Sequence, residues 1–157
     1  MVVGRRKLLS LLLVTCAALA AALVYIEVQP RETLQLTLND AAITVELAQT
    51  PQALARGLSN RQQLAANEGM LLDFGARSSA GIWMRHMNFP LDVIWLDEDL
   101  KIISITENMA PVSYPNVFFP TEPARYVLEV TSGWVRTHQI TVGMKGILAA
   151  DTATTLY

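Results

Sequence analysis

An uncharged apolar run near the N-terminus limits most strongly how this chain folds, because it withdraws the first residues from any globular core. The run covers 19 residues, Leu8–Ile26, with Ser10 and Thr15 as its polar interruptions. A helix of that length would be roughly 28 Å long at about 1.5 Å per residue, close to the ~30 Å hydrocarbon core of a bilayer. Three basic residues at positions 5–7 precede the run, so the positive-inside rule predicts that the rest of the chain crosses the membrane.

Three interpretations of this run remain open. It is an uncleaved signal anchor, a signal peptide cleaved near the small residues Ala18–Ala20, or a segment lipidated at Cys16. All three predict an extracytoplasmic, periplasmic domain of the cell envelope, either membrane-anchored through the N-terminal helix or secreted after cleavage. The expected organisation is a signal anchor or signal peptide, a short linker, a single β-rich domain and a tail, at residues 1–26, 27–32, 33–148 and 149–157.

Length, charge and cysteine content restrict the exported part further. A chain of 157 residues has room for one domain besides the targeting segment. Residues 27–157 carry 14 acidic and 9 basic side chains, a net charge of −5. Nucleic acid is therefore excluded as a partner, because phosphate binding needs a basic surface. Cys16 is the sole cysteine, so the expected domain has no disulfide and depends on its apolar core.

Alternating apolar residues predict a mainly β (β-rich α+β) fold. A hairpin is expected at 33–47, and further strands at 69–72, 82–87, 91–96, 102–105, 126–130 and 140–147. Thr50 as a cap, Pro51 in the first turn and Gly57 as a stop predict one short helix, and a helical turn is expected at 134–139. Several short strands with one or two short helices indicate a compact antiparallel sandwich or a partly closed barrel.

A proline-rich segment, 109–123, interrupts the strand pattern. It contains four prolines interleaved with Tyr114, Phe118 and Phe119, so regular structure is nearly excluded. A loop of this length in a compact domain is either a mobile linker or a functional cover. The three aromatic residues favour a cover that folds back onto apolar surface.

Asp92 is an unusual residue because it lies within the apolar strand 91–96. An unpaired carboxylate there would cost several kcal/mol, so Asp92 lies near water at the strand end or meets a cation or a set of N–H donors. Two roles follow. It is a ligand-binding or acid–base carboxylate at a pocket rim, or it accepts hydrogen bonds that fix the corner after Pro90.

Trp83 and Arg85 share one face of the expected strand 82–87. An indole beside a guanidinium suits an anionic or aromatic ligand. In the alternative interpretation Arg85 neutralises Asp92 or Glu129 and Trp83 fills the core. Glu129 faces away from the apolar side of its own strand, so an exposed position is equally compatible with the pattern. The motif at 84–87 contains two methionines and a histidine, but its methionines point to opposite faces, and we expect neither a metal nor another cofactor.

Several ordered motifs resemble one family. They are Arg56–Arg61, Glu68–Phe74, Trp83–Asp97, Ala124–Val130, Gly133–Trp134 and Ile140–Gly143. Together they are similar to domain-of-unknown-function family 192, over roughly 34–148. Two positions depart from the family pattern, Ser59 where Met is common and His86 where Asn or Gly is common. The resemblance implies a compact β-rich, often exported domain without an established activity, and it supplies no catalytic residues.

The leading functional hypothesis is a noncatalytic module that binds a small ligand or an envelope partner. The expected groove lies between the corner at 83–92 and the proline-rich segment, and its candidate residues are Arg56, Trp83, Arg85, Asp92 and Glu129. One alternative is a hydrolase that uses Asp92 and Glu129 as acid and base, since two carboxylates suffice for glycoside cleavage when they flank one bond. The other is a structural assembly factor of the envelope.

Overall fold

Strands dominate the computed structural model, which describes Cys16 and residues 33–150. In chain order the elements are β1 (Thr33–Leu38), β2 (Ala41–Ala48), α2 (Pro51–Arg56), β3 (Glu68–Ser78), β4 (Ile82–Trp83), β5 (Leu91–Leu96), β6 (Ile102–Met109), the 3₁₀ turn η1 (Pro111–Ser113), β7 (Val117–Phe118), β8 (Ala124–Thr131), α3 (Trp134–Thr137) and β9 (Gly146–Ala150). The expected β-rich class is confirmed. Apart from Cys16, the expected signal segment 1–26 and linker 27–32 lie outside the described residues. Within the described part of the chain, no helix is long and apolar enough to cross a membrane.

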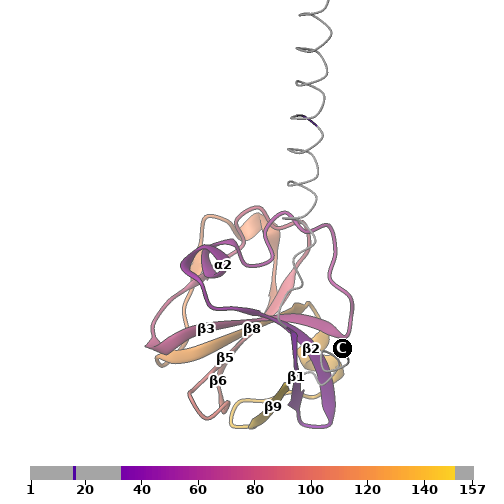
Figure 1. Cartoon of the computed structure of the whole chain (residues 1–157), viewed down its shortest axis with the longest axis vertical. Coiled ribbons are helices and arrows are strands. Elements are labelled where there is room, and N and C mark those ends of the chain that lie inside the picture. The colour runs from indigo at the N-terminus through magenta and orange to yellow at the C-terminus, as the bar shows by residue number, and fades with distance from the viewer. Residues whose placement is uncertain (1–15, 17–32, 151–157) are drawn as a thin grey trace, which may run out of the picture. The chain divides into compact units, whose positions relative to one another are not determined.

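Seven strands form one sheet in the spatial order β6-β5-β8-β3-β2-β1-β9 (Figure 1). Every neighbouring pair is antiparallel except β2 and β3, which run parallel. Parallel strands need a crossover connection, and residues 49–67, which include α2, provide it. The expectation of a wholly antiparallel arrangement is therefore wrong at this one pair.

The sheet curls until residues beside its two edge strands meet. Lys101, just before β6, forms an antiparallel bridge with Lys145, just before β9. Next to this bridge the Gly146 N–H donates to the carbonyl oxygen of Leu100 at 2.9 Å. Of the two arrangements expected from the sequence, the structure thus has the partly closed barrel, formed by a single sheet.

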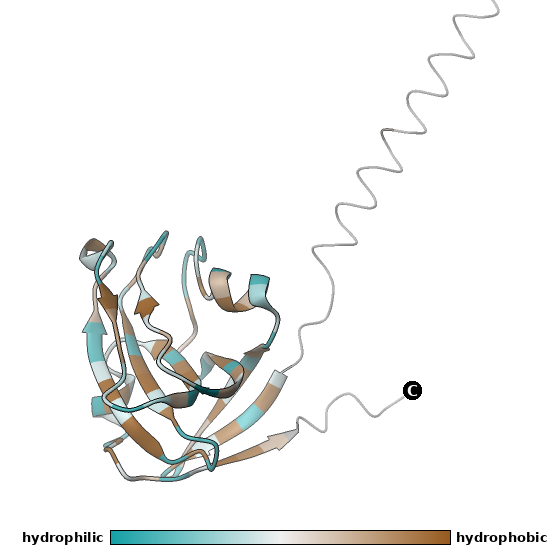
Figure 2. Ribbon diagram, turned by 90° about the vertical axis from the view of Figure 1, so that its left-hand side faces the viewer, coloured by the Kyte–Doolittle hydropathy of each residue, from teal (hydrophilic) through white to brown (hydrophobic). Residues whose placement is uncertain are grey.

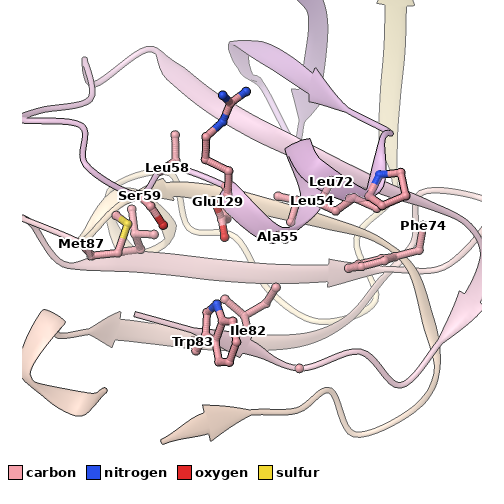
Figure 3. A pocket seen from close by; sticks show the side chains of 15 residues that line it. Leu54, Ala55, Leu58, Ser59, Leu72, Phe74, Ile82, Trp83, Met87 and Glu129 are labelled. Atoms are coloured by element: carbon pink, nitrogen blue, oxygen red, sulfur yellow. The ribbon is translucent and has the colours of Figure 1, made fainter. Parts of the chain in front are cut away.

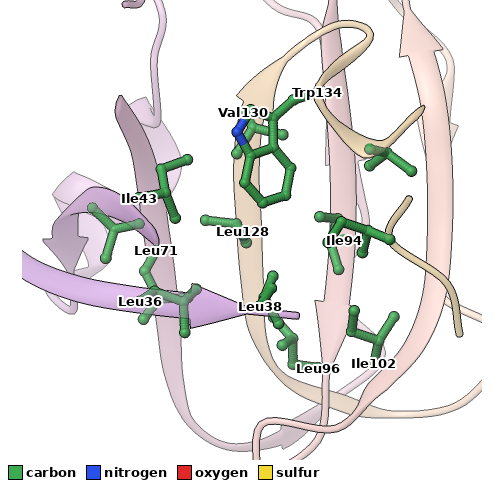
Figure 4. Packing of buried hydrophobic residues seen from close by; sticks show 13 residues of the cluster. Leu36, Leu38, Ile43, Leu71, Ile94, Leu96, Ile102, Leu128, Val130 and Trp134 are labelled. Carbon is green, nitrogen blue, oxygen red and sulfur yellow. The ribbon is translucent and has the colours of Figure 1, made fainter. Parts of the chain in front are cut away.

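Each face of the curled sheet carries its own apolar core. The core on the α3 side, which we call the α3-side core, consists of Leu36, Leu38, Ile43, Val45, Leu71, Ile94, Leu96, Ile102, Leu128, Val130, Trp134, Val135 and Ile140 (Figure 4). The core on the opposite face, the α2-side core, consists of Ala48, Leu58, Met70, Leu72, Ile82, Met84, Leu91, Val93, Trp95, Met109, Ala124 and Val127.

Strand β5 contributes to both cores because it lies between β6 and β8 and is covered on both faces. Its six residues are all buried, with Val93 and Trp95 in the α2-side core and Ile94 and Leu96 in the α3-side core. The hydropathy colours of Figure 2 show how apolar residues gather along such central strands. A strand covered on both faces has this continuous apolar sequence, as we expected from the pattern.

Helix α2 begins and ends where the sequence predicts, and α3 begins where expected but ends two residues earlier, at Thr137. In α2 the Thr50 hydroxyl oxygen accepts a hydrogen bond from the Ala53 N–H at 3.2 Å, and Pro51 is the first helical residue. Gly57 ends the helix with a φ of 50°, a left-handed backbone that favours glycine. The helical turn expected at 134–139 is α3.

The strand expected at 82–87 is much shorter, since β4 holds only Ile82 and Trp83. The chain then turns, and His86 has a φ of 56°. The loop after α2 holds this turn, because the Asn60 N–H donates to the carbonyl oxygen of His86 at 2.8 Å and the Ser59 hydroxyl donates to that of Arg85 at 2.9 Å. The expected alternation of side chains therefore ends before Arg85.

The proline-rich segment contains more regular structure than expected. Its first residue ends β6, η1 follows, and β7 pairs with β4 in a separate two-stranded sheet. Gly81 permits a close approach, because a Cβ atom there would lie 2.4 Å from Cγ1 of Val117. The segment does fold back onto apolar residues, since Phe118 packs against the α2-side core.

The C-terminal strand begins later than the sequence suggested. The strand expected at 140–147 is wrong in its first half, where the chain turns through Gly143 with a φ of 95°. Strand β9 instead runs from Gly146 to Ala150 and pairs with β1. It therefore extends two residues into the segment 149–157 that was expected to be a tail.

Candidate functional site

A pocket with a volume of about 330 Å³ lies against the α2-side core. Helix α2 and the loop after it form one wall, and β4 forms the opposite wall (Figure 3). Its lining residues are mostly apolar: Pro51, Leu54, Ala55, Arg56, Gly57, Leu58, Ser59, Leu72, Phe74, Gly81, Ile82, Trp83, Met87, Leu91 and Glu129. The parallel crossover from β2 to β3 brings α2 over this face of the sheet, so the topology itself creates the pocket.

Glu129 is the acidic residue of this pocket and comes from the middle of β8. Its strand neighbours in register are Met70 on β3 and Val93 on β5, both in the α2-side core. The residue is only 5% exposed, and its Oε2 atom has no hydrogen-bond partner among the described residues. Gly57 lies directly beside the carboxyl group, because a Cβ atom at Gly57 would be 3.4 Å from Oε2.

Burial governs the ionisation of Glu129. Loss of hydration raises the pKa of this carboxyl from 4.5 to about 7, and the positive charge of Arg61 opposes the shift. Arg61 is itself paired with Glu46, with 2.6 Å between the guanidinium Nη2 and the carboxylate Oε2. The Glu129 side chain is thus divided between its ionised and neutral forms near neutral pH.

Trp83 lies at the rim of the pocket with 44% of its surface exposed. Its ring makes an edge-to-face contact with Tyr114 of the proline-rich segment, with 6.4 Å between the ring centroids. The guanidinium carbon of Arg85 lies 5.9 Å from the centroid of the same ring. The interpretation in which Trp83 fills the core is therefore wrong, although Trp83 and Arg85 do lie together.

Three of the five candidate residues line the same pocket. Trp83 and Glu129 do so from β4 and β8, and Arg56 does so from the last turn of α2, where its side chain is exposed. Arg85 reaches Trp83 but is not among the lining residues.

Asp92 lies on the opposite face of the sheet and is fully buried. Its Oδ1 atom accepts a hydrogen bond from the Asn108 N–H at 2.9 Å. Its Oδ2 atom accepts from the N–H groups of Gly133 at 2.9 Å and Val135 at 3.0 Å, at the start of α3. Asp92 thus accepts hydrogen bonds from backbone N–H groups, as one of the two expected roles required. The donors come from β6 and α3 rather than from the corner after Pro90.

The acid–base pair of the hydrolase hypothesis is wrong for this chain. Asp92 pairs in register with Val130, and Glu129 pairs with Val93, so the two carboxyl groups point to opposite faces of the sheet. Residues directly opposite each other in an antiparallel pair share a face. Asp92 and Glu129 therefore cannot flank one bond.

Sequence reasoning missed the residues that close the pocket around Glu129. Leu58 and Leu72 are buried there, and Phe74 lines it from within β3. Gly81 was given no role from the sequence, yet it lets β7 approach β4. One signal for its role was present, because a glycine next to a strand often marks a close backbone approach.

The described residues contain no group of three or more His, Cys, Asp and Glu side chains that could hold a metal ion. His86 lies in an exposed turn, and its neighbour Met84 is buried in the α2-side core. The arrangement around Glu129 is therefore a small, mainly apolar pocket in which Glu129 is the one carboxylate among the lining residues.

Comparisons with known proteins agree with the motif pattern. The model of the family DUF192, described as an uncharacterised ACR, matches residues 34–146. A crystal structure of a candidate transcription regulator from Sinorhizobium meliloti 1021 is 32% identical, with a TM-score of 0.72, and the match covers 76% of this chain and 96% of that chain. A crystal structure of a protein of unknown function from Novosphingobium aromaticivorans DSM 12444 is 27% identical, with a TM-score of 0.70, covering 76% of this chain and 88% of that chain. No curated protein matches the chain.

Proposed function

Because the chain belongs to the DUF192 family, which is described as uncharacterised, we propose its function from its own pocket. The domain is a noncatalytic module that binds a small, mainly apolar ligand, and Glu129 meets the polar group of that ligand. The observation that carries this proposal is the buried Glu129 carboxyl, whose Oε2 atom has no partner among the described residues and which forms part of the wall of a pocket of about 330 Å³.

The position of Glu129 is costly for folding alone. A buried polar group without a hydrogen bond costs about 1–3 kcal/mol, and more when it is charged. Both strand neighbours in register, Met70 and Val93, are apolar and buried, so an apolar side chain would suit this site better. A titratable residue with a raised pKa in an apolar pocket is characteristic of functional sites.

The pocket walls are held in place before any ligand arrives. The loop after α2 is bonded to the turn after β4 through Ser59 and Asn60, as described above, and the Asn88 side-chain amide donates to the carbonyl oxygen of Arg61 at 2.7 Å. Walls of this kind favour binding because little conformational entropy is lost when the ligand enters.

The volume and the wall chemistry define the ligand class. At about 30 Å³ per heavy atom, a pocket of this size holds roughly ten heavy atoms. Among the lining residues Glu129 is the sole carboxylate, and the Ser59 hydroxyl already donates to Arg85. This wall offers one carboxylate for binding instead of the two that hydrolysis of a glycoside uses.

A fragment screen with two matched variants tests the proposal. Leu54 and Leu64 are both partly buried against the α2-side core, but only Leu54 lines the pocket. We expect small aromatic fragments to shift the amide NMR signals of the loop after α2 and of β4 in the full-length chain. Leu54→Trp should weaken that binding at least about tenfold by filling the pocket, while Leu64→Trp should not. Equal binding to both variants would place the fragments elsewhere and refute the proposal.

A second function, contact with another envelope protein as an assembly factor, is favoured by one observation. The proline-rich segment exposes Val112 at 89% and Phe119 at 62%, close in sequence to the strand that pairs with β4. A photoreactive side chain at position 119 should then form an adduct with one protein in cells. Val112→Ser should abolish that adduct without changing fragment binding, and an unchanged adduct would count against this function.

Localisation outside the cytoplasm also stays a proposal, supported by the apolar run Leu8–Ile26 and the basic residues before it. Alkaline phosphatase fused after the domain is active only when it is exported. We expect an active fusion with the natural sequence and an inactive one when residues 1–26 are removed. An inactive fusion with the natural sequence would contradict export.

A further inference from the structure

We infer that the pocket selects ligands in which a protonated amine is attached to a small apolar or aromatic body, with Glu129 as the group that receives the ammonium. This inference rests on the proposed function and names the class of ligand that the pocket takes. It follows from the acceptor left open at Glu129, from the walls around it and from the charges that face it.

The Glu129 carboxyl group has an oxygen atom that lacks a hydrogen-bond donor among the described residues. An ionised carboxylate only accepts hydrogen bonds, and the buried Oε2 atom of Glu129 accepts none from the described residues. An ammonium group supplies three donors and the opposite charge, so beside the Glu129 carboxylate it offsets the loss of hydration. A ligand alcohol supplies one donor without the charge, and a ligand carboxylate supplies neither.

The walls suit the body of such a ligand. Phe74 and Trp83 offer aromatic surfaces, and Met87 adds a thioether, all among the lining residues. Gly57 has no side chain between the pocket and Glu129, since even one Cβ atom would lie 3.4 Å from Oε2. A ligand of roughly ten heavy atoms that fills the pocket therefore brings its polar end against this carboxyl group.

The charged groups around Glu129 come from several elements. Arg56 lies on α2 with an exposed side chain, Arg61 follows in the next loop and is paired with Glu46 of β2, and Arg85 and His86 lie exposed in the turn after β4. Asp92 on β5 lies on the other face of the sheet. The cations are thus exposed or already paired, while the buried wall carries the carboxyl group.

Trp83 beside Arg85 suggested an anionic ligand. An anion fits this arrangement less well than an ammonium does. An anion deep enough to use the apolar walls would lie beside Glu129, whereas Arg56 is exposed and Arg85 is not a lining residue. Two negative charges placed side by side repel strongly in a poorly hydrated site. The domain sequence, with its net charge of −5 over residues 27–157, also favours the approach of a cation.

Binding of the ammonium is coupled to the ionisation of Glu129. The amine pairs with the ionised carboxylate, and the neutral form must lose its proton first. With the pKa of Glu129 at about 7, the ionised fraction rises about tenfold between about pH 6 and pH 8. The affinity for an amine should rise by the same factor, whereas the affinity for a neutral analogue should not.

The experiment compares three probes of one shape, benzylamine, benzyl alcohol and benzoate, by titration calorimetry and amide NMR on the full-length chain in mild detergent. At about pH 8 benzylamine should bind at least about tenfold more tightly than the other two, and at about pH 6 most of that advantage should be lost. Glu129→Gln should equalise benzylamine and benzyl alcohol. Glu107→Gln removes a carboxylate that is paired with Arg136 outside the pocket, and it should change nothing.

The outcomes separate the inference from the proposed function. If benzyl alcohol binds and Leu54→Trp blocks it, but benzylamine shows no advantage and no pH dependence, the ligand class is wrong and the binding function stands. If benzoate binds most tightly, the ligand class is likewise wrong. If no probe binds, both fall. The pH comparison uses the natural protein, so it decides the question even if Glu129→Gln does not fold. His86→Gln serves as the control for the histidine in the turn, and it should leave the advantage of benzylamine unchanged.

Discussion

Asp92 and Glu129 lie on adjacent strands and are both buried, yet the two faces of the sheet treat them in opposite ways. On the α3 side, three backbone N–H groups donate to Asp92 and hold the start of α3. On the α2 side, the Oε2 atom of Glu129 has no donor among the described residues and lies at a pocket. A buried carboxylate with its donors in place is part of the fold, whereas one without them is available to a ligand.

Removing the Asp92 carboxylate on the α3 side should change the stability of the protein more than any other substitution proposed for these carboxyl groups. Asp92→Ala should destabilise the protein by about 3–5 kcal/mol, because it removes a fully buried side chain and leaves the N–H groups of Asn108, Gly133 and Val135 without their acceptor, the last of them in a buried position. Urea unfolding monitored by tryptophan fluorescence measures the change. Asp99→Ala, at an exposed turn residue, serves as the control and should cost less than about 0.5 kcal/mol. A loss below about 1 kcal/mol for Asp92→Ala would remove the structural role.

The next prediction concerns Glu129 on the α2 side, where a substitution should stabilise the protein instead of destabilising it. The folded-state pKa of Glu129, about 7, lies above its ordinary 4.5, so its contribution to stability is complete at low pH and is lost as pH rises through 7. Glu129→Gln removes this loss and should stabilise the protein by roughly 3 kcal/mol at about pH 8. It should have little effect at about pH 4.

Urea unfolding at the two pH values measures this difference, with Glu107→Gln as the matched control at a partly exposed, paired glutamate. If Glu129→Gln destabilised the protein equally at both pH values, the carboxyl group would have a structural partner. The comparison with Asp92 would then fail.

Asp92 and Glu129 also show which structural features the sequence could predict and which it could not. The alternating pattern predicted both faces of β5 and placed Glu129 opposite Leu128 and Val130, and the structure agrees. It could not tell which face α2 covers, since that depends on the parallel pairing of β2 with β3. The donors to Asp92 lie 16 to 43 residues away along the chain, so no local sequence pattern predicts them.

Local signals predicted local structure well elsewhere in the chain. Thr50, Pro51 and Gly57 defined α2 because caps and stops act within one turn. The turn at Arg85 and His86 was missed because the loop after α2 holds it through backbone hydrogen bonds. Three candidate residues, Arg56, Trp83 and Glu129, meet at one pocket, while Asp92 faces the other core. The pattern thus identified residues that matter but not the face on which each one lies.

A third carboxylate, Asp73 of β3, should show a smaller change in stability, with the opposite dependence on pH from Glu129. Burial raises the pKa of Asp73, but hydrogen bonds from the Arg125 guanidinium and the Gly75 N–H outweigh it, and the pKa lies below its ordinary value. Its contribution to stability is therefore present at neutral pH and is lost as the pH falls through that lowered pKa, the reverse of Glu129. Asp73→Asn should cost about 1 kcal/mol at neutral pH and nothing in strong acid.

Urea unfolding of natural protein and Asp73→Asn across the acid range checks this prediction. Asp73 and Glu129 lie on adjacent strands, and the natural protein should lose stability on both sides of a maximum, through Asp73 in acid and through Glu129 as the pH rises from about 4.5 to about 7. Glu129→Gln should abolish only the loss between about pH 4.5 and pH 7, and Asp73→Asn only the loss in more acidic solution. If either variant changed both sides, the two carboxyl groups would be coupled, and the pocket could not be treated as a site separate from the rim of the sheet.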